Sequence, residues 1–140
     1  MKKFLLLASF AIFVFSAAAN PADDAIATLV AVDAKGKGNE AASKSWPKVA
    51  ALGSEKIPDL LAAMDKANGL GQNWLRAAVD AIAERVIRKG EKLPSKELMK
   101  FLEDSSHSPI ARRLAFELFQ KATPKQAAKL VPGFISDPAP

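Results

Sequence analysis

The sequence predicts an all-α protein. Apolar residues recur three and four positions apart over residues 72–88, which is the spacing of one face of a helix. Stretches on both sides have the same spacing, and breaks rich in Gly, Pro and Asn separate them. No stretch of the chain alternates apolar and polar residues in the way that a half-buried strand does. We therefore expect antiparallel helices joined by short loops.

Residues 1–19 have the order of a secretory signal peptide. Two lysines precede an apolar run from Phe4 to Phe15, and small residues follow at Ala17 and Ala19, where a signal peptidase reads them. We expect cleavage after Ala19, so that the chain is exported, periplasmic or secreted, without a stable membrane span. The alternative is a retained signal anchor in the membrane, although the run is shorter than the about 20 residues that cross a bilayer.

Composition narrows the classes of function. The chain has no Cys, which excludes disulfides and thiolate metal sites. Its net charge of +5 includes the two lysines of the signal peptide, and the remaining excess is too small to indicate nucleic-acid binding. We expect no cofactor, no metal site and no nucleic-acid partner.

Residues 20–38 are predicted to form a capping helix followed by a Gly-rich turn. Asn20 is a preferred cap, Pro21 suits the first turn, and Asp23 favours the positive end of the helix dipole. The apolar stripe continues to about Ala34, and the Gly-Lys-Gly-Asn segment that follows ends the helix.

The next two helices each contain a proline. A helix is expected from Glu40 to Leu52, and Pro47 within it predicts a kink or a division into two pieces near Ser45. Another helix is expected over residues 55–66, where Pro58 lies in the tolerated first turn.

Residues 67–71 are predicted to be a loop before the central helix of residues 72–88, which Gly90 ends with a left-handed cap. The apolar stripe of this helix needs partners on more than one side. The residues that we expect in the core are Trp46, Leu60, Leu61, Met64, Trp74, Leu75, Ala78, Val79, Ile82, Val86, Leu98, Phe101, Leu102, Leu114 and Leu118.

Three more helices are expected after the central one. One opens at Ser95, and a second runs from Ile110 to Lys121. Thr123 followed by Pro124 is a strong start signal for the last helix, which Pro132 interrupts.

The helices repeat in pairs along the chain. Residues 60–65 match residues 98–104 in the placement of apolar residues after a shift of 38, and residues 75–82 match 112–119 after a shift of 37. Residues 131–137 match the first pattern again. Each unit is a helix that has an apolar stripe and ends in Asp, then a turn, then a helix that carries Arg.

This pattern resembles the HEAT repeat family, whose units are helical hairpins of about 40 residues. The resemblance implies a short α-solenoid of about three antiparallel helix pairs over residues 39–140, with the last repeat incomplete. In that family the turn Asp and the Arg of the second helix stabilise the turn and the stacking of neighbours. The residues that match these roles are Asp65, Arg76, Asp104, Arg112 and Arg113. The alternative is an irregular helical bundle.

His107 is the only histidine, and Asp104 and three serines surround it. These residue types suggest a hydrolase triad, but a triad needs a base that a buried acid orients, and neighbours in one turn do not easily supply that geometry. We interpret the segment as an exposed turn whose Asp and Ser cap the helix after Pro109. We therefore expect no catalytic residue.

Two hypotheses of function follow. The first is an exported, non-catalytic helical-repeat scaffold for protein–protein interaction, because stacked helix pairs build extended faces. The alternative is a small-ligand-binding or hydrolytic domain with a pocket near Trp74 or His107. A shallow apolar groove favours the first, and a pocket of converging polar groups favours the second. The uncovered apolar residues that predict self-association are Leu130, Val131, Phe134 and Ile135.

We predict that the protein isolated from its native host begins at Asn20. Intact-mass measurement tests this, since loss of residues 1–19 lowers the mass by a known amount. A full-length mass in the membrane fraction would contradict cleavage and support the signal anchor.

Overall fold

A computed structural model describes residues 20–136 of the chain. Its elements, in chain order, are α1 (Pro21–Val30), α2 (Asn39–Ala50), η1 (Ser54–Lys56), α3 (Ile57–Met64), α4 (Gly69–Arg88), α5 (Ser95–Glu103), α6 (Pro109–Ala122), α7 (Pro124–Leu130) and η2 (Val131–Ser136), where η denotes a 3₁₀-helix. No strand occurs among the described residues, so the prediction of an all-α protein is confirmed. The predicted signal peptide, residues 1–19, lies outside the described residues.

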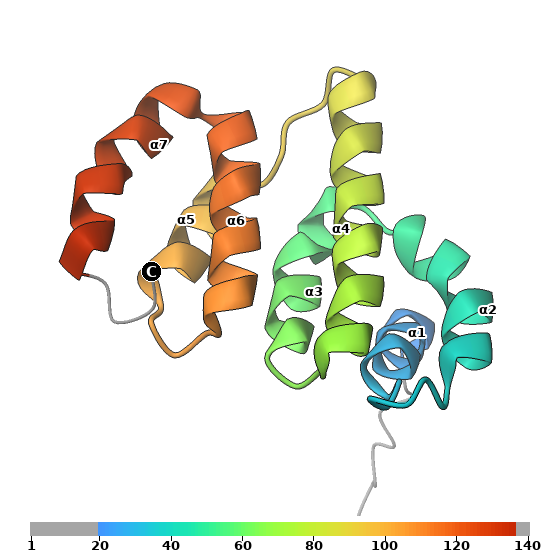
Figure 1. Cartoon of the computed structure of the whole chain (residues 1–140). Helices are drawn as coiled ribbons and strands as arrows, with labels where there is room; N and C mark the ends of the chain where they lie inside the picture. The colour runs from blue at the N-terminus through green and yellow to red at the C-terminus, as the bar shows by residue number, and fades with distance from the viewer. Residues whose placement is uncertain (1–19, 137–140) are drawn as a thin grey trace, which may run out of the picture.

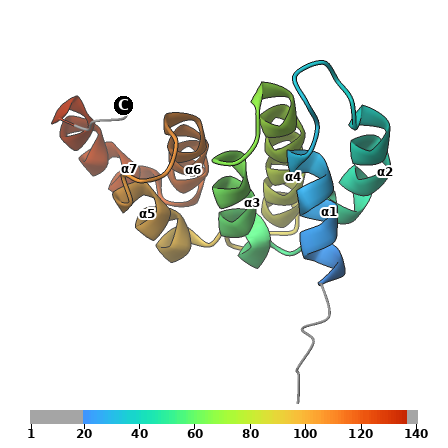
Figure 2. The same ribbon diagram turned by 90° about the horizontal axis from the view of Figure 1, so that it is seen from below.

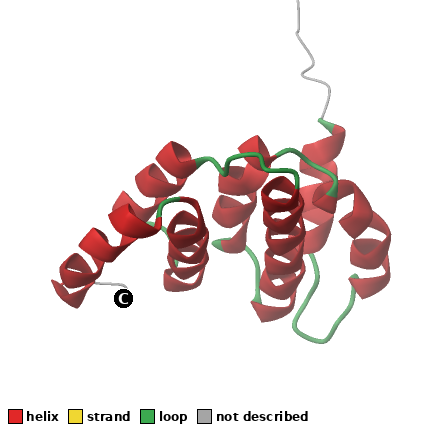
Figure 3. Ribbon diagram, turned by 90° about the horizontal axis from the view of Figure 1, so that it is seen from above, coloured by secondary structure: helices red, strands yellow, loops and turns green. Residues whose placement is uncertain are grey.

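The helices are arranged in two rows. α1, α3 and α5 lie in one row, and α2, α4 and α6 lie in the other (Figure 1, Figure 2). Helices that follow each other in the chain pack as pairs, α1 with α2, α3 with α4, and α5 with α6. Neighbouring pairs are joined where α4 contacts α1 and α2 and where α3 contacts α5 and α6, and loops connect the helix ends (Figure 3). The core therefore lies between the rows and continues from one pair to the next.

α1 begins as predicted and ends earlier than predicted. The Asn20 side chain accepts a hydrogen bond from the Ala22 amide at 3.1 Å, and the helix stops at Val30 rather than near Ala34. Asp33 is the reason, because its carboxylate accepts hydrogen bonds from two amides of the following turn, at 2.8 and 2.9 Å.

α2 is one continuous helix, so the predicted division near Ser45 is wrong. Pro47 lies inside it and cannot donate a hydrogen bond to the carbonyl of Ser43. Both residues are exposed, so water reaches this carbonyl and the loss does not break the helix.

α4 begins at Gly69, within the stretch that we expected to be a loop. Asn68 caps it, because its side-chain oxygen accepts hydrogen bonds from the amides of Leu70 at 2.9 Å and Gly71 at 3.2 Å. The amide group of the same side chain donates to the carbonyl of Val32 at 2.6 Å. One side chain thus starts α4 and ties it to the end of α1.

Gly71 allows the start of α4 to contact the end of α1. A Cβ at this position would lie 3.0 Å from the carbonyl oxygen of Leu29 and 3.3 Å from that of Val30. Contacts this short are not tolerated without a shift of the α1 backbone. Glycine is required here for close approach of two helices, not for an unusual backbone angle.

The two tryptophans are partly buried, which corrects the expectation that both belong to the core. The Trp74 indole donates a hydrogen bond to the Asn39 side chain at 3.0 Å and so links α4 to the first turn of α2. Trp46 packs against the core at its edge. The other expected core residues are all buried: Leu60, Leu61, Met64, Leu75, Ala78, Val79, Ile82, Val86, Leu98, Phe101, Leu102, Leu114 and Leu118.

The last segment folds back onto α6. Pro132 ends regular α-helix, as expected, and the chain continues as η2. The Phe134 ring contacts Phe116 edge to face, with centroids 5.0 Å apart. Leu130 is half-buried and Val131 is 51% exposed. Self-association through this segment stays a prediction, and the side chain of Ile135 lies outside the described part of the structure.

We predict that Gly71→Ala lowers the free energy of unfolding by about 1–3 kcal/mol, the usual cost of inserting a methyl group into a filled space. Gly69→Ala is the matched control, because a Cβ at Gly69 meets no atom within 4 Å. The control is expected to be neutral or to stabilise by up to about 1 kcal/mol, since alanine favours the helix more than glycine. Urea midpoints compare the two variants, and equal midpoints would contradict a close contact of α1 with α4.

Candidate functional site

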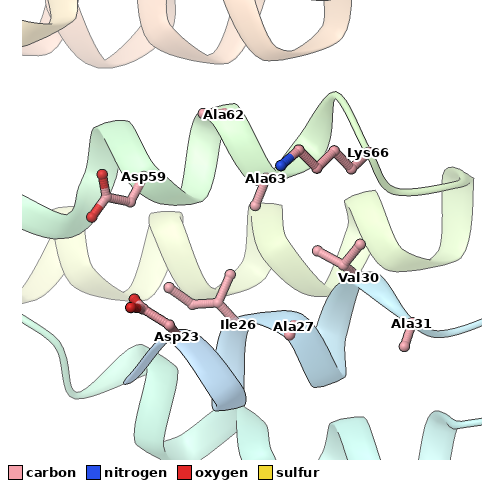
Figure 4. Close-up of a pocket in the computed structure, with 9 residues that line it drawn as sticks. All are labelled: Asp23, Ile26, Ala27, Val30, Ala31, Asp59, Ala62, Ala63 and Lys66. Atoms are coloured by element: carbon pink, nitrogen blue, oxygen red, sulfur yellow. The ribbon is translucent and has the colours of Figure 1, made fainter. Parts of the chain in front are cut away.

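A groove of about 420 Å³ runs between α1 and α3 on the surface of the first row. Ile26 and Val30 of α1 and Ala63 of α3 point toward the space between the two helices (Figure 4). The groove is open along its length rather than enclosed. Its lining residues are Asp23, Ile26, Ala27, Val30, Ala31, Asp59, Ala62, Ala63 and Lys66.

The helix pattern of α1 explains why apolar groups remain on this face. Ala25, Ile26 and Leu29 are buried in the core, whereas Val30 is half-buried and Ala27 is exposed. On α3 the large apolar residues face the core, and the half-buried alanines face the groove. Because alanine side chains are short, the two helices leave uncovered methyl groups between them.

Opposite charges lie at the two ends of the groove. Asp23 and Asp59 lie near the N-terminal ends of α1 and α3, and the backbone of Lys66 lies at the other end, with its amine extending back toward Ala63 (Figure 4). Lys56 forms an ion pair with Asp59 at 2.8 Å. The hydrogen bond and charge of Asp59 raise the pKa of Lys56, and the charge of Asp23 adds to this. Within residues 20–136 neither Asp23 nor Lys66 forms an ion pair.

The lining of the groove contains no His, Ser or Thr. Its charged side chains are those of Asp23, Asp59 and Lys66. Over the described residues there is also no group of three or more side chains that could hold a metal ion. What the groove offers to another molecule is a row of apolar groups between an acidic end and a basic end.

His107 forms a junction between helix pairs and is not the exposed turn residue that we expected. Its Nδ1 lies 2.6 Å from an oxygen of Asp65, at the end of α3, and its ring stacks on Phe101 with centroids 3.8 Å apart. The second oxygen of Asp65 accepts a hydrogen bond from the Ser108 amide at 2.8 Å. The His107 side chain is accordingly only 22% exposed.

The expected contact between Asp65 and Arg76 does not form. Arg76 instead forms an ion pair with Glu117 of α6 at 2.6 Å and a longer one with Asp80 at 3.6 Å. Asp65 instead contacts His107, which belongs to the next helix pair. Both residues stabilise the stacking of neighbouring pairs, but with partners other than each other.

The equivalent residues of the next pair lie in different environments. Arg112 is buried and donates to the carbonyl of Leu102 at 2.9 and 3.2 Å, so it binds the end of α5. Asp104 accepts hydrogen bonds from the amide and hydroxyl of Ser106 at 3.0 and 2.6 Å. Arg113 is exposed on the surface of α6.

The surroundings of His107 do not form a hydrolase triad. Its Nδ1 faces Asp65, as in a triad, but its Nε2 lies 3.7 Å from a second carboxylate, that of Asp104. The hydroxyl of Ser108 accepts a hydrogen bond from the Ala111 amide and caps α6. The imidazole thus lies between two acids and not between an acid and a nucleophile.

Two features of the fold were not predicted from the sequence. Arg85 donates hydrogen bonds to the carbonyls of Ala50 and Leu52 and thereby caps the end of α2. The other feature is the groove itself. The only indication of the groove in the sequence is the alanines on the outward faces of α1 and α3.

Comparison of the chain with protein-family models, with curated proteins and with solved structures finds no match. Within the described part of the chain, no helix combines the length and the apolar character that crossing a membrane requires.

We predict that Asp65→Asn lowers the free energy of unfolding by about 1–2 kcal/mol at pH 7, since the carboxylate accepts two hydrogen bonds. Partial burial raises the pKa of Asp65, but hydrogen bonds from His107 and Ser108 outweigh burial and hold this pKa below its ordinary value. A depressed folded-state pKa contributes stability that is complete above the unfolded pKa of about 3.9 and is lost as pH falls through the folded pKa.

Urea midpoints of both proteins from pH 5 down to pH 2.5 test this sign. The difference between the parent and Asp65→Asn is expected to shrink as the pH falls below about 4. Glu84→Gln is the control, because Glu84 is exposed and forms no ion pair within residues 20–136. A difference that grows as pH falls would contradict the assigned role of Asp65.

Proposed function

We propose that this chain is an exported, non-catalytic helical-repeat scaffold that binds a protein partner along the groove between α1 and α3. The open apolar groove is the observation that carries this proposal. Uncovered apolar surface bordered by charged residues is characteristic of protein-binding sites. A site for a small molecule is instead concave and encloses most of its ligand.

The succession of helix pairs supports a HEAT-like solenoid as the architecture of the scaffold. In a solenoid each unit contacts only its neighbours. The contacts of α4 with α1 and α2, and of α3 with α5 and α6, fit this rule. Polar links between successive pairs, from Asp65 to His107 and from Arg76 to Glu117, fit it as well.

The sequence supports export. The signal-like segment of residues 1–19 precedes Asn20, which is also the cap of α1. A helix that begins directly after the expected cleavage position is fully retained in the mature chain. The groove would then be intact in the exported protein.

The proposal predicts that a photo-crosslinking residue at Ala31 captures a partner from the cell envelope. Ala31 lines the groove and is exposed, so a large side chain there leaves the space beside Ala63 open. Benzoylphenylalanine is introduced at Ala31, and the protein is expressed with its own N-terminal segment in the native host. Ala77 on α4 is the matched control, because it is an exposed helical alanine that does not line the groove. We expect a discrete crosslinked protein at Ala31 and none at Ala77.

Two results would contradict the proposal. One is the absence of any crosslink at Ala31, and the other is the same set of crosslinks at both positions. Mass spectrometry of the crosslinked band identifies the partner and the segment that lies in the groove.

A further inference from the structure

We infer that the segment that occupies the α1/α3 groove is an amphipathic helix, acidic in its first turn and basic in its last, lying antiparallel to α1 and α3. This rests on the proposed function, because it assigns the chemistry of the partner at the same site.

A helical occupant suits the walls better than an extended one. The middle of the groove is lined by apolar side chains of two helices, whose own backbone groups are hydrogen-bonded within the helices. An extended peptide would lose water from its amides and carbonyls and find no partners there. A helix satisfies its backbone internally and presents only side chains, as in helix-in-groove recognition.

The small size of the lining residues determines which side chains the occupant needs. Ala27, Ala31, Ala62 and Ala63 supply only methyl groups, so the groove is filled by large apolar side chains of the partner rather than by its own. α1 has 10 residues, which corresponds to about 15 Å of helix. A partner helix of about three turns, with Leu-sized residues spaced three and four apart, covers this length.

The charges at the two ends of the groove determine the direction in which the occupant helix lies. A free helix is stabilised by acidic residues in its first turn and basic residues in its last turn. Such a helix matches the groove in one direction only, with its basic end at Asp23, because Lys56 already pairs with Asp59, and with its acidic end toward Lys66. Because α1 and α3 both run from the acidic end toward Lys66 (Figure 4), the occupant runs antiparallel to them.

A synthetic peptide tests the binding. The probe is a fluorescein-labelled peptide of about 14 residues, with Glu in its first turn, Leu at helical spacing and Lys in its last turn. Fluorescence anisotropy with the chain from Asn20 onward is expected to show saturable binding. Ala63→Leu is expected to weaken binding about tenfold or more by filling the groove, whereas Ala77→Leu is expected to leave it unchanged.

A charge reversal tests the ends. Lys66→Glu is expected to weaken binding about threefold at low salt, the size of one exposed charge pair. A probe with Gln in place of Glu removes this effect. Lys125→Glu is the control, because Lys125 lies on α7 and does not line the groove.

Disulfide trapping tests the direction, which is straightforward in a chain without Cys. A probe with Cys before its first turn is expected to form a disulfide with Ala31→Cys, near the Lys66 end of the groove, in a variant that keeps every charged lining residue. A probe with Cys after its last turn is not expected to form it. Trapping in the opposite sense would overturn the antiparallel direction.

Absence of saturable binding, or equal binding by Ala63→Leu and the parent protein, would overturn the helical occupant. Either result leaves the scaffold proposal open to its own test, since a crosslink from Ala31 to a protein partner does not depend on these probes. Conversely, the probe peptide could bind to the groove while no crosslink forms in the cell. This result would support the helical occupant and contradict the proposed protein partner.

Discussion

The close contact between the end of α1 and the start of α4 determines how the helices of the N-terminal half are placed. Asn68 both caps α4 and donates to Val32, and Gly71 lets the two backbones approach. α1, which also packs on α2, is thereby fixed on α4 and beside α3. The groove between α1 and α3 is a consequence of this placement, because its width depends on where α1 is held. A substitution that moves α1 would change the width of the groove without altering any residue that lines it.

Polar contacts connect the helix pairs where the apolar core does not reach. Asp65 and His107 join α3 to the turn between α5 and α6, and Arg76 and Glu117 join α4 to α6. Such half-exposed pairs contribute little stability each, but they have directional requirements that apolar contacts lack. They therefore restrict how one pair is rotated on the next. The geometry of any extended binding face depends on that rotation.

Local rules predicted the helices well and tertiary contacts less well. The Asn20 cap, the Pro-marked helix starts and nearly all apolar core positions follow from spacing and capping chemistry. The start of α4 was missed because glycine disfavours helix, while the contacts of Asn68 and Gly71 with α1 outweigh that preference. The sequence pattern led us to expect that Asp65 contacts Arg76, which is nearer in the chain. In the structure its partner is His107, which is 42 residues away. Residue type alone does not distinguish two such partners.

The alanines of the groove show how stability and binding compete on one surface. A larger apolar residue at Ala63 would cover Val30, which is only half-buried, and add buried area to the isolated chain, at about 25 cal/mol per Å². The alanine leaves that area uncovered, and in the proposed complex a partner would cover it. The conformational cost of ordering the groove is already met by the fold, because α1 is held by α4. A short helix from a partner then loses mainly its own freedom on binding, and a rigid groove with small side chains is suited to that task.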